Sequence, residues 1–149
     1  MKIRKAVFED SPTLFQCVME AFKDYILLIG RTPGPMLEDY SEAIKRHQIF
    51  VAETEEGIVG FTLIKDGEGD FMWLDVLAVY PDKGNHGVGK KLIAMAEEFI
   101  RNCGKAECRL YTHVKYQKPI AIYQSLGYQI YNRVQENGFD RYYMKKTLL

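Results

Sequence analysis

The sequence predicts a mixed α/β fold with a largely antiparallel central sheet flanked by helices, in a single domain covering residues 1–149. Two patterns predict it. Short apolar runs alternate with segments in which apolar residues recur every three or four positions, and several of the runs are joined by tight glycine turns typical of hairpins. A chain of 149 residues, 47% of them hydrophobic, is long enough to bury a core.

The first third of the chain is predicted to form one strand and two helices. Residues 2–7 alternate as a short strand does, and the Asp-Ser-Pro sequence at 10–12 is typical of a helix start. One apolar helix face should follow, consisting of Leu14, Phe15, Val18, Phe22, Tyr25 and Ile26. The glycines and prolines of residues 30–35 end this helix, and a shorter one is expected over residues 37–47.

The middle of the chain reads as three consecutive strands. Residues 49–53 and 58–64 form a hairpin around a turn at 55–57. After a glycine-rich turn at 66–70, residues 71–79 form a strand that is long and apolar enough to be central.

The last third alternates helix and strand and ends in a hairpin. The first helix should present one apolar face, consisting of Val88, Leu92, Met95, Ala96, Phe99 and Cys103. Gly104 closes it, a strand covers 106–114 and a short helix covers 118–125. Strands at 128–135 and 139–148 then flank an Asn-Gly turn, which gives the overall order β-α-α-β-β-β-α-β-α-β-β.

Composition excludes several classes of protein. The net charge is zero, so we expect no nucleic-acid partner, and no apolar run approaches the ~20 residues that span a membrane. No apolar segment of signal-peptide length follows the N-terminus. Cys17, Cys103 and Cys108 are odd in number and lack metal-ligand spacing, so we expect reduced thiols, no metal and a cytoplasmic location.

One stretch organises the rest of the chain. An apolar run stops at Pro81, a loop with three glycines follows, and a helix then begins near Val88. This order leaves unpaired backbone N–H groups at a helix N-terminus, and nearby lysines add positive charge. The stretch therefore predicts an anion site, for phosphate or pyrophosphate.

Two other interpretations of the loop remain open. In one, the glycines only satisfy the geometry of a strand-to-helix turn. In the other, residues 84–90 form a phosphate-binding P-loop, since they read as Gly, four residues and Gly-Lys. A nucleotide hydrolase needs Ser or Thr at the next position to bind magnesium, and this chain has Lys91.

The loop resembles the acetyl-coenzyme A (acetyl-CoA) loop of the GCN5-related N-acetyltransferase (GNAT) family. That pattern is Gln or Arg, two residues of any kind, Gly, one residue, then Gly or Ala. Gly87 and Gly89 match its glycines, whereas Gly84 stands where the family usually has Arg or Gln. The departure weakens one side-chain contact but still allows the backbone cradle.

A second motif resembles the closing segment of the same family, an Asn-led helix with a tyrosine followed by Leu-Gly-Phe or Leu-Gly-Tyr. The matching positions are Tyr123, Leu126, Gly127 and Tyr128. Tyr116 stands where Asn is common and Pro119 where Ala is common, which puts an Asn-mediated coenzyme contact in doubt.

The resemblance implies the acyl-CoA N-acyltransferase fold over essentially the whole chain, with acetyl-CoA as cosubstrate and a primary amine on a small molecule or peptide as acceptor. A homodimer is possible. The helix–loop–helix segment near the N-terminus would form much of the acceptor pocket. The implied coenzyme-binding residues are Leu77, Ala78 and Val79 of the central strand and Gly84, Asn85, His86, Gly87, Val88, Gly89 and Lys90 of the loop.

The resemblance also places Tyr123 near the coenzyme sulfur. A phenol with a reference pKa of about 10 can donate a proton to a thiolate whose conjugate acid has a pKa of about 8.5–10. The alternative is that Tyr123 belongs to the core, with its hydroxyl directed to water.

The acceptor amine must lose a proton, and Asp75 is the first candidate base because it interrupts the apolar strand before the glycine loop. It can also be a carboxylate on an exposed face, or one paired with a cation. Glu53 and His113, at the ends of predicted strands, come next. We expect His86 to contact phosphate or solvent and His47 to lie on a surface helix.

No cysteine sits at a predicted helix N-terminus, so direct attack in a ternary complex is expected, without an acetyl-cysteine intermediate. Phe22, Tyr25, Tyr40 and Trp73 belong either to the mouth of the acceptor pocket or to the core. The expected function is acyl-CoA-dependent N-acetyl transfer. A non-catalytic CoA-binding sensor and, less well supported, a P-loop nucleotide hydrolase are the alternatives.

Overall fold

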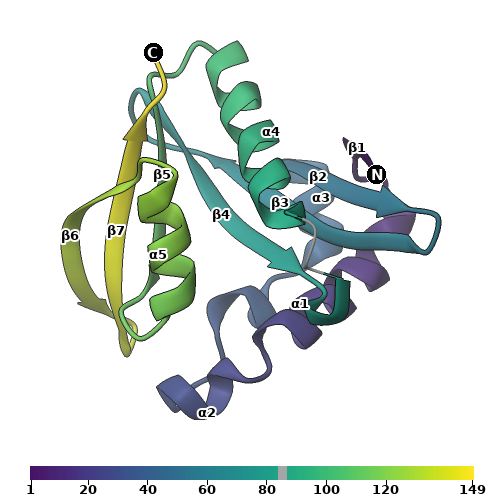
Figure 1. The fold of residues 1–149 in the computed structure, drawn as a ribbon, viewed down its shortest axis with the longest axis horizontal. Coiled ribbons are helices and arrows are strands. Elements are labelled where there is room, and N and C mark those ends of the chain that lie inside the picture. The colour runs from purple at the N-terminus through teal and green to yellow at the C-terminus, as the bar shows by residue number, and fades with distance from the viewer. Residues whose placement is uncertain (84–86) are drawn as a thin grey trace.

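The computed structural model describes residues 1–83 and 87–149, in which seven strands form one sheet of order β1-β2-β3-β4-β5-β7-β6 (Figure 1). The strands are β1 (Lys2–Lys5), β2 (Gln48–Thr54), β3 (Gly57–Asp66), β4 (Phe71–Val79), β5 (Glu107–His113), β6 (Gln129–Glu136) and β7 (Phe139–Thr147). The helices are α1 (Ser11–Phe22), α2 (Tyr25–Ile29), α3 (Tyr40–Arg46), α4 (Val88–Asn102) and α5 (Gln117–Ser125), with single 3₁₀ turns η1 (Phe8–Asp10), η2 (Gly34–Leu37) and η3 (Pro81–Lys83). Neighbouring strands are antiparallel except β4 and β5, which are parallel. The mixed, largely antiparallel sheet is as predicted.

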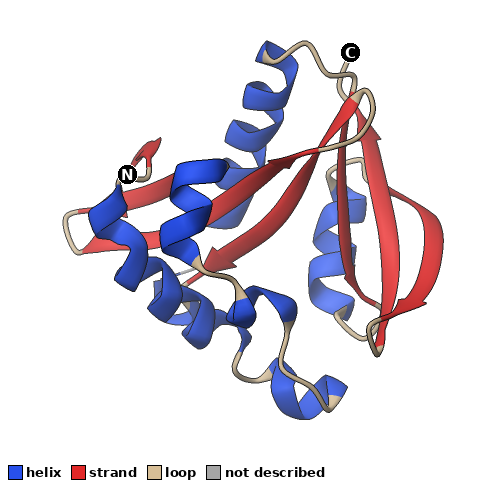
Figure 2. Ribbon diagram, turned by 180° about the vertical axis from the view of Figure 1, so that it is seen from behind, coloured by secondary structure: helices blue, strands red, loops and turns tan. Residues whose placement is uncertain are grey.

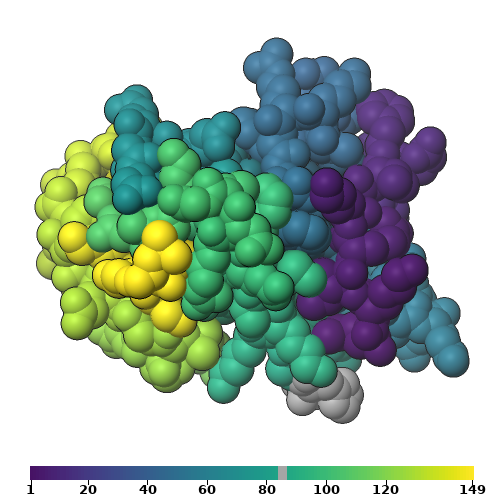
Figure 3. All heavy atoms as spheres, turned by 90° about the horizontal axis from the view of Figure 1, so that it is seen from above, coloured from purple at the N-terminus to yellow at the C-terminus, as the bar shows by residue number. Residues whose placement is uncertain are grey.

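Helices cover both faces of the sheet. Helices α1 and α3 lie on one face, and α4 and α5 lie on the other (Figures 1 and 2). From above, α4 lies between the C-terminal part of the chain and the purple N-terminal segment (Figure 3). None of the helices in the described ranges is both long and apolar enough to cross a membrane.

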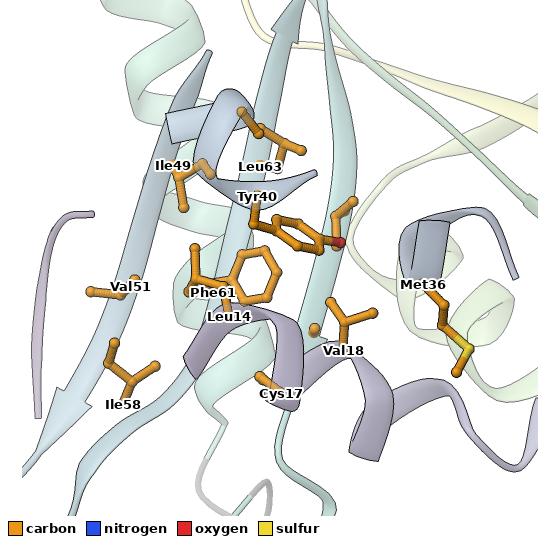
Figure 4. Close-up of a cluster of buried hydrophobic side chains, with 13 residues drawn as sticks. Leu14, Cys17, Val18, Met36, Tyr40, Ile49, Val51, Ile58, Phe61 and Leu63 are labelled. Carbon is orange, nitrogen blue, oxygen red and sulfur yellow. The ribbon is translucent and has the colours of Figure 1, made fainter. Parts of the chain in front are cut away.

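The core beneath α1 joins the N-terminal helices to the first strands of the sheet (Figure 4). The Tyr40 ring packs edge-on against Phe61 at a centroid distance of 5.4 Å, and its hydroxyl donates to the Pro35 carbonyl at 2.6 Å. Because the hydroxyl is satisfied, this ring is buried at little cost. The other labelled residues of this cluster are Leu14, Cys17, Val18, Met36, Ile49, Val51, Ile58 and Leu63.

One extra residue interrupts the pairing of β3 with β4. Leu63 pairs with Val76 and Ile64 with Leu74, so Asp75 has no partner on β3. The bulge changes which residues of β4 face which core: Leu74 belongs to the cluster beneath α4, whereas Val76 belongs to the cluster beneath α1. Without the extra residue, both side chains would lie on the same face.

The bulge coincides with the end of pairing between β4 and β5. These two strands pair over only three positions, the last joining Trp73 to Arg109. Beyond that point they diverge (Figure 1). Because bulges bend a strand and increase its local twist, we attribute the separation to the extra residue at Asp75.

The N-terminal helices differ from the prediction in two ways. The first helix stops at Phe22 and a separate helix, α2, begins at Tyr25, so the apolar face is not continuous and Phe15 is 45% exposed. The second begins at Tyr40 rather than at residue 37, because the Asp39 carboxylate accepts from the N–H groups of the next turn.

The first strand and helix α4 also differ from the sequence-based prediction. The first strand ends at Lys5, because the Val7 N–H donates to Asp10 at 2.8 Å instead of continuing the ladder. On α4, Cys103 is exposed, and Ile93 and Ile100 complete the buried face instead. The expected turn between the last two strands is present, with Asn137 and Gly138 both at positive φ.

A buried polar network fixes α4 to the C-terminal strands. Glu97 of α4 is 6% exposed and accepts from the Tyr128 hydroxyl at 2.8 Å and from Lys146 of β7 at 3.0 Å. The Tyr128 hydroxyl also lies 3.1 Å from the Cys108 sulfur. A buried carboxylate is tolerated only while it is paired in this way.

We expect Lys146→Met to lower the free energy of unfolding by about 2 kcal/mol, because Glu97 loses its closest cation while staying buried. Urea denaturation measures this. The matched control is Lys145→Met, whose partner Glu107 is 4.0 Å away and whose side chain is 41% exposed, so the loss should stay below about 1 kcal/mol. Equal losses in the two variants would contradict the role of the network.

Candidate active site

A cleft of about 710 Å³ opens where β4 and β5 separate. Its walls come from the segment between α1 and η2, from β4, from the start of α4, and from β5, α5 and β7. The predicted site residues that line it are Asp75, Leu77, Val79, Gly87, Gly89, Lys90 and Tyr123. Ala78 and Val88 do not line it, and Gly84, Asn85 and His86 lie outside the described residues.

Among residues 1–83 and 87–149, the wall formed by β4 presents an unpaired main-chain edge. The Tyr80 N–H donates to the Val59 carbonyl on β3 at 2.9 Å. Because main-chain groups alternate in direction along a strand, Ala78 also faces β3, while the N–H and C=O groups of Leu77 and Val79 face the opposite edge. That edge has lost β5 as a partner, so Leu77 and Val79 are free to pair with a bound ligand.

The N-terminus of α4 closes one end of this edge. Gly87 caps the helix at a φ of 70° with no side-chain hydrogen bond, and the first intrahelical bond runs from Lys91 N to Gly87 O. The N–H groups of the three residues between them therefore have no partner within the helix. A Cβ on Gly89 would lie 3.9 Å from a methyl carbon of Val79, so a longer side chain would occupy the cleft.

Tyr123 reaches the cleft from α5 on the opposite wall. Its ring packs edge-on against Tyr128 at a centroid distance of 5.8 Å, which fixes the ring plane. Burial raises the pKa of the Tyr123 phenol above its ordinary value. The group thus stays protonated at neutral pH and can act as a donor.

Asp75, the extra residue of the β4 bulge, lies in the cleft as one member of a charged cluster. Its carboxylate is 3.2 Å from the Lys65 ammonium, and this ammonium also lies 2.6 Å from Glu38. The Tyr111 hydroxyl donates to the Asp75 carboxylate at 3.4 Å. Burial lowers the pKa of Lys65, but its bonds to the two carboxylates outweigh that effect, so the pKa is raised. The Lys65 ammonium therefore stays charged at neutral pH beside the Asp75 carboxylate.

The remaining candidate bases are placed less favourably. His113 lines the cleft and burial lowers its pKa, but Nδ1 already accepts from the Lys115 N–H at 3.1 Å. A neutral ring in that tautomer carries its proton on Nε2 and has no free lone pair. Glu53 pairs with Arg4 outside the cleft, and His47 follows α3, also outside it.

Sequence reasoning missed several residues of the cleft, among them Lys65, Glu38, Tyr111 and Arg141. Lys65 could have been predicted from the sequence, because the predicted strand that ends next to Lys65 is followed directly by the strand that carries Asp75 and can pair with it. The other three come from elements distant in sequence, for which hydrophobic patterns carry no signal. Of the four aromatic residues considered, Phe22 and Tyr25 line the cleft, Tyr40 is buried and Trp73 stacks outside it.

The segment between α1 and η2 crosses from one half of the sheet to the other over this cleft. The Tyr25 ring stacks on Tyr116, which precedes α5, at a centroid distance of 3.9 Å. Arg31 donates to the Asn137 carbonyl in the β6–β7 turn at 2.7 Å. Residues of this segment, together with neighbours at the end of α1 and in and just after η2, contribute to the cleft lining.

Comparisons with known proteins agree with this geometry. A family model described as an acetyltransferase (GNAT) domain matches residues 45–130. An uncharacterised N-acetyltransferase of Escherichia coli strain K12, YjgM, is 25% identical over 135 residues, covering 85% of this chain and 81% of its own.

Solved structures share the fold. The PaiA N-acetyltransferase of Thermoplasma acidophilum, in complex with coenzyme A, has a TM-score of 0.81 at 23% identity, covering 98% of each chain. The ribosomal-protein-S18-alanine N-acetyltransferase of Escherichia coli has a TM-score of 0.78 at 18% identity, covering 99% of this chain and 93% of its own. The split between β4 and β5, the uncapped glycine start of α4 and these matches lead to one conclusion: the chain belongs to the GNAT family of N-acetyltransferases, with the acyl-CoA N-acyltransferase fold.

Proposed function

We propose that this protein transfers the acetyl group of acetyl-CoA to a primary amine by direct attack in a ternary complex. The observation that carries the proposal is the open main-chain edge of β4. This edge runs from the uncapped start of α4 towards Asp75, and Tyr123 lines the opposite wall of the same cleft.

The coenzyme has two sets of partners in this arrangement. The amide groups of its pantetheine arm pair with the main chain of Leu77 and Val79, in the manner of an added strand. Its pyrophosphate lies at the N-terminus of α4, where N–H groups without a partner inside the helix and the helix dipole favour negative charge, with Lys90 nearby. This placement leaves the thioester between β4 and α5.

The acceptor amine must first lose a proton. An amine with a pKa of about 10.4 is almost entirely protonated at neutral pH, and neutralising it costs roughly 4–5 kcal/mol. Asp75 accepts this proton directly or through a water molecule. The Lys65 ammonium, 3.2 Å from the Asp75 carboxylate, holds that side chain in place in the cleft.

The neutral amine then attacks the thioester carbonyl. A C–N bond forms, the C–S bond breaks, and the sulfur leaves as a thiolate. The Tyr123 phenol donates a proton to it, so the products are an amide and free coenzyme A. Cys17 and Cys108 are buried, and burial raises the pKa of each thiol to about 12, which supports direct attack rather than an acetyl-cysteine.

The first test is free-thiol release from acetyl-CoA with a panel of amines. Turnover with at least one amine supports the proposal. Tight binding of acetyl-CoA without turnover of any amine would favour a non-catalytic sensor instead, and no binding would contradict both.

Tyr123→Phe should lower kcat by about 100-fold and leave acetyl-CoA affinity nearly unchanged, because only the acid is lost. Since the pKa of Tyr123 is raised, this phenol should stay protonated up to about pH 10. Its deprotonation should therefore not lower the wild-type rate below that pH. Steady-state kinetics against pH measures both. Tyr131→Phe is the control, because Tyr131 is 38% exposed and outside the cleft. Equal kcat in wild type and Tyr123→Phe would remove Tyr123 from the mechanism.

Asp75→Asn should reduce kcat/KM by about 100-fold at pH 7, and the deficit should shrink as pH approaches the pKa of the free amine, where solvent supplies neutral amine. Lys65 retains Glu38 as a partner in this variant. The control is Asp66→Asn at the exposed end of β3. A deficit that stays constant with pH would indicate a structural role for Asp75.

Gly89→Val should raise the dissociation constant of coenzyme A at least about tenfold, because the added carbons enter the cleft beside Leu77 and Val79. Isothermal titration calorimetry measures this. Ala94→Val places the same side chain on the exposed face of the same helix and should bind coenzyme A as wild type does. Normal affinity in Gly89→Val would show that coenzyme A does not approach this turn.

A further inference from the structure

Arg141 lies on β7, where it pairs with His113 of β5. Its side chain is only 14% exposed, and it contributes to the cleft lining. The guanidinium carbon is 4.6 Å from the centroids of both the Tyr111 and the Phe139 rings. Two aromatic contacts and low exposure hold this cation in a fixed position.

Most of the hydrogen-bonding capacity of Arg141 is unused. Nη1 donates to Glu136 at 2.9 Å, and within the described residues this is the only hydrogen bond of the guanidinium, which has five N–H groups. Nη2 lies beside Gly34 of η2, 3.8 Å from where a Cβ would stand, and both residues line the cleft. A side chain longer than a methyl at this position would compete with a ligand for these donors.

Tyr111 connects Arg141 to the proposed base. Its ring contacts the Arg141 guanidinium, and its hydroxyl donates to Asp75. A carboxylate suited to an acceptor amine and a cation with free donors therefore share one wall, separated by a single tyrosine side chain. An acceptor that carries opposite charges at its two ends matches this pattern.

We propose that the acceptor is an amino acid or similar compound that carries a carboxylate as well as the reacting amine, and that Arg141 binds this carboxylate. The inference rests on the proposed function, because it assumes that the amine approaches Asp75. Free N–H groups of a guanidinium fit a carboxylate in a two-pronged arrangement. A phosphate dianion fits less well because it needs a second cation, and Lys65 is already held by Glu38 and Asp75.

Arg109 offers a matched control. It also stacks on rings, at 4.1 Å from Phe71 and 5.2 Å from Tyr131, and it also pairs with a glutamate on its own sheet, Glu107. It does not line the cleft. Arg141→Gln should fold, because Glu136 keeps its hydrogen bond from the Tyr143 hydroxyl and is 29% exposed.

The experiment compares α- and ω-amino acids of increasing length with their carboxamides, which keep the amine and remove the negative charge. In wild type, the best acid should exceed its amide by about 10- to 100-fold in kcat/KM, the range of charge-assisted hydrogen bonds. Arg141→Gln should reduce this ratio to within about twofold, and Arg109→Gln should preserve it. Arg141→Lys keeps the positive charge but loses the paired N–H groups of the guanidinium. This variant should retain part of the preference for acids over amides.

Calorimetric binding of the same acids and amides to the protein loaded with coenzyme A separates the two proposals. If no amine is acetylated but acids bind more tightly than amides in an Arg141-dependent way, the proposed catalysis fails and the carboxylate site stands. Three outcomes would overturn the carboxylate site even where amines are acetylated. Wild type could use amides as well as acids. Alternatively, the preference for acids could survive Arg141→Gln, or it could be lost equally in Arg109→Gln.

Discussion

The extra residue in β4 is the constraint on which the rest of the structure depends. With Asp75 unpaired on β3, the strand switches the face on which its buried side chains lie, from Leu74 beneath α4 to Val76 beneath α1. The same bend ends the pairing with β5 after Trp73. A continuous ladder would have satisfied the main chain of Leu77 and Val79 and left no cleft. A local departure from regular pairing thus opens the site and sets a carboxylate at its centre.

Strands β1–β4 form one half of the sheet and strands β5–β7 the other, and three residue pairs join β4 to β5 directly. Because this pairing is short, other contacts are needed to hold the two halves together. One tie is the buried carboxylate of Glu97, which holds α4 to Lys146 and to Tyr128. Another tie is the crossing segment before η2, which reaches the far half through Tyr25 and Arg31. Together these contacts join the two halves of the sheet on either side of the cleft.

The sequence predicts most of the fold because its signals are local. The Asn-Gly turn, the glycine loop and the apolar helix faces each depend on neighbouring residues, and the order of strands and helices follows from them. The bulge at Asp75 carried no such signal, since the strand reads as uniformly apolar apart from one aspartate. Helix breaks were also missed, because tertiary packing and the Asp39 cap outweigh the periodicity that runs past Phe22. The charged partners of Asp75 depend on long-range pairing, which hydrophobic patterns do not encode.

The acceptor side and the coenzyme side of the cleft are built from different kinds of structure. In the proposed function, the coenzyme contacts come from a central strand and a helix start that pack directly against the core. The acceptor side draws on Phe22, Tyr25 and the short turns that follow, which are joined to the far half of the sheet by surface contacts. Under the proposed function, substitutions in this segment would change the acceptor side and leave the coenzyme side intact. This division would let the choice of amine change while the acyl donor stays the same.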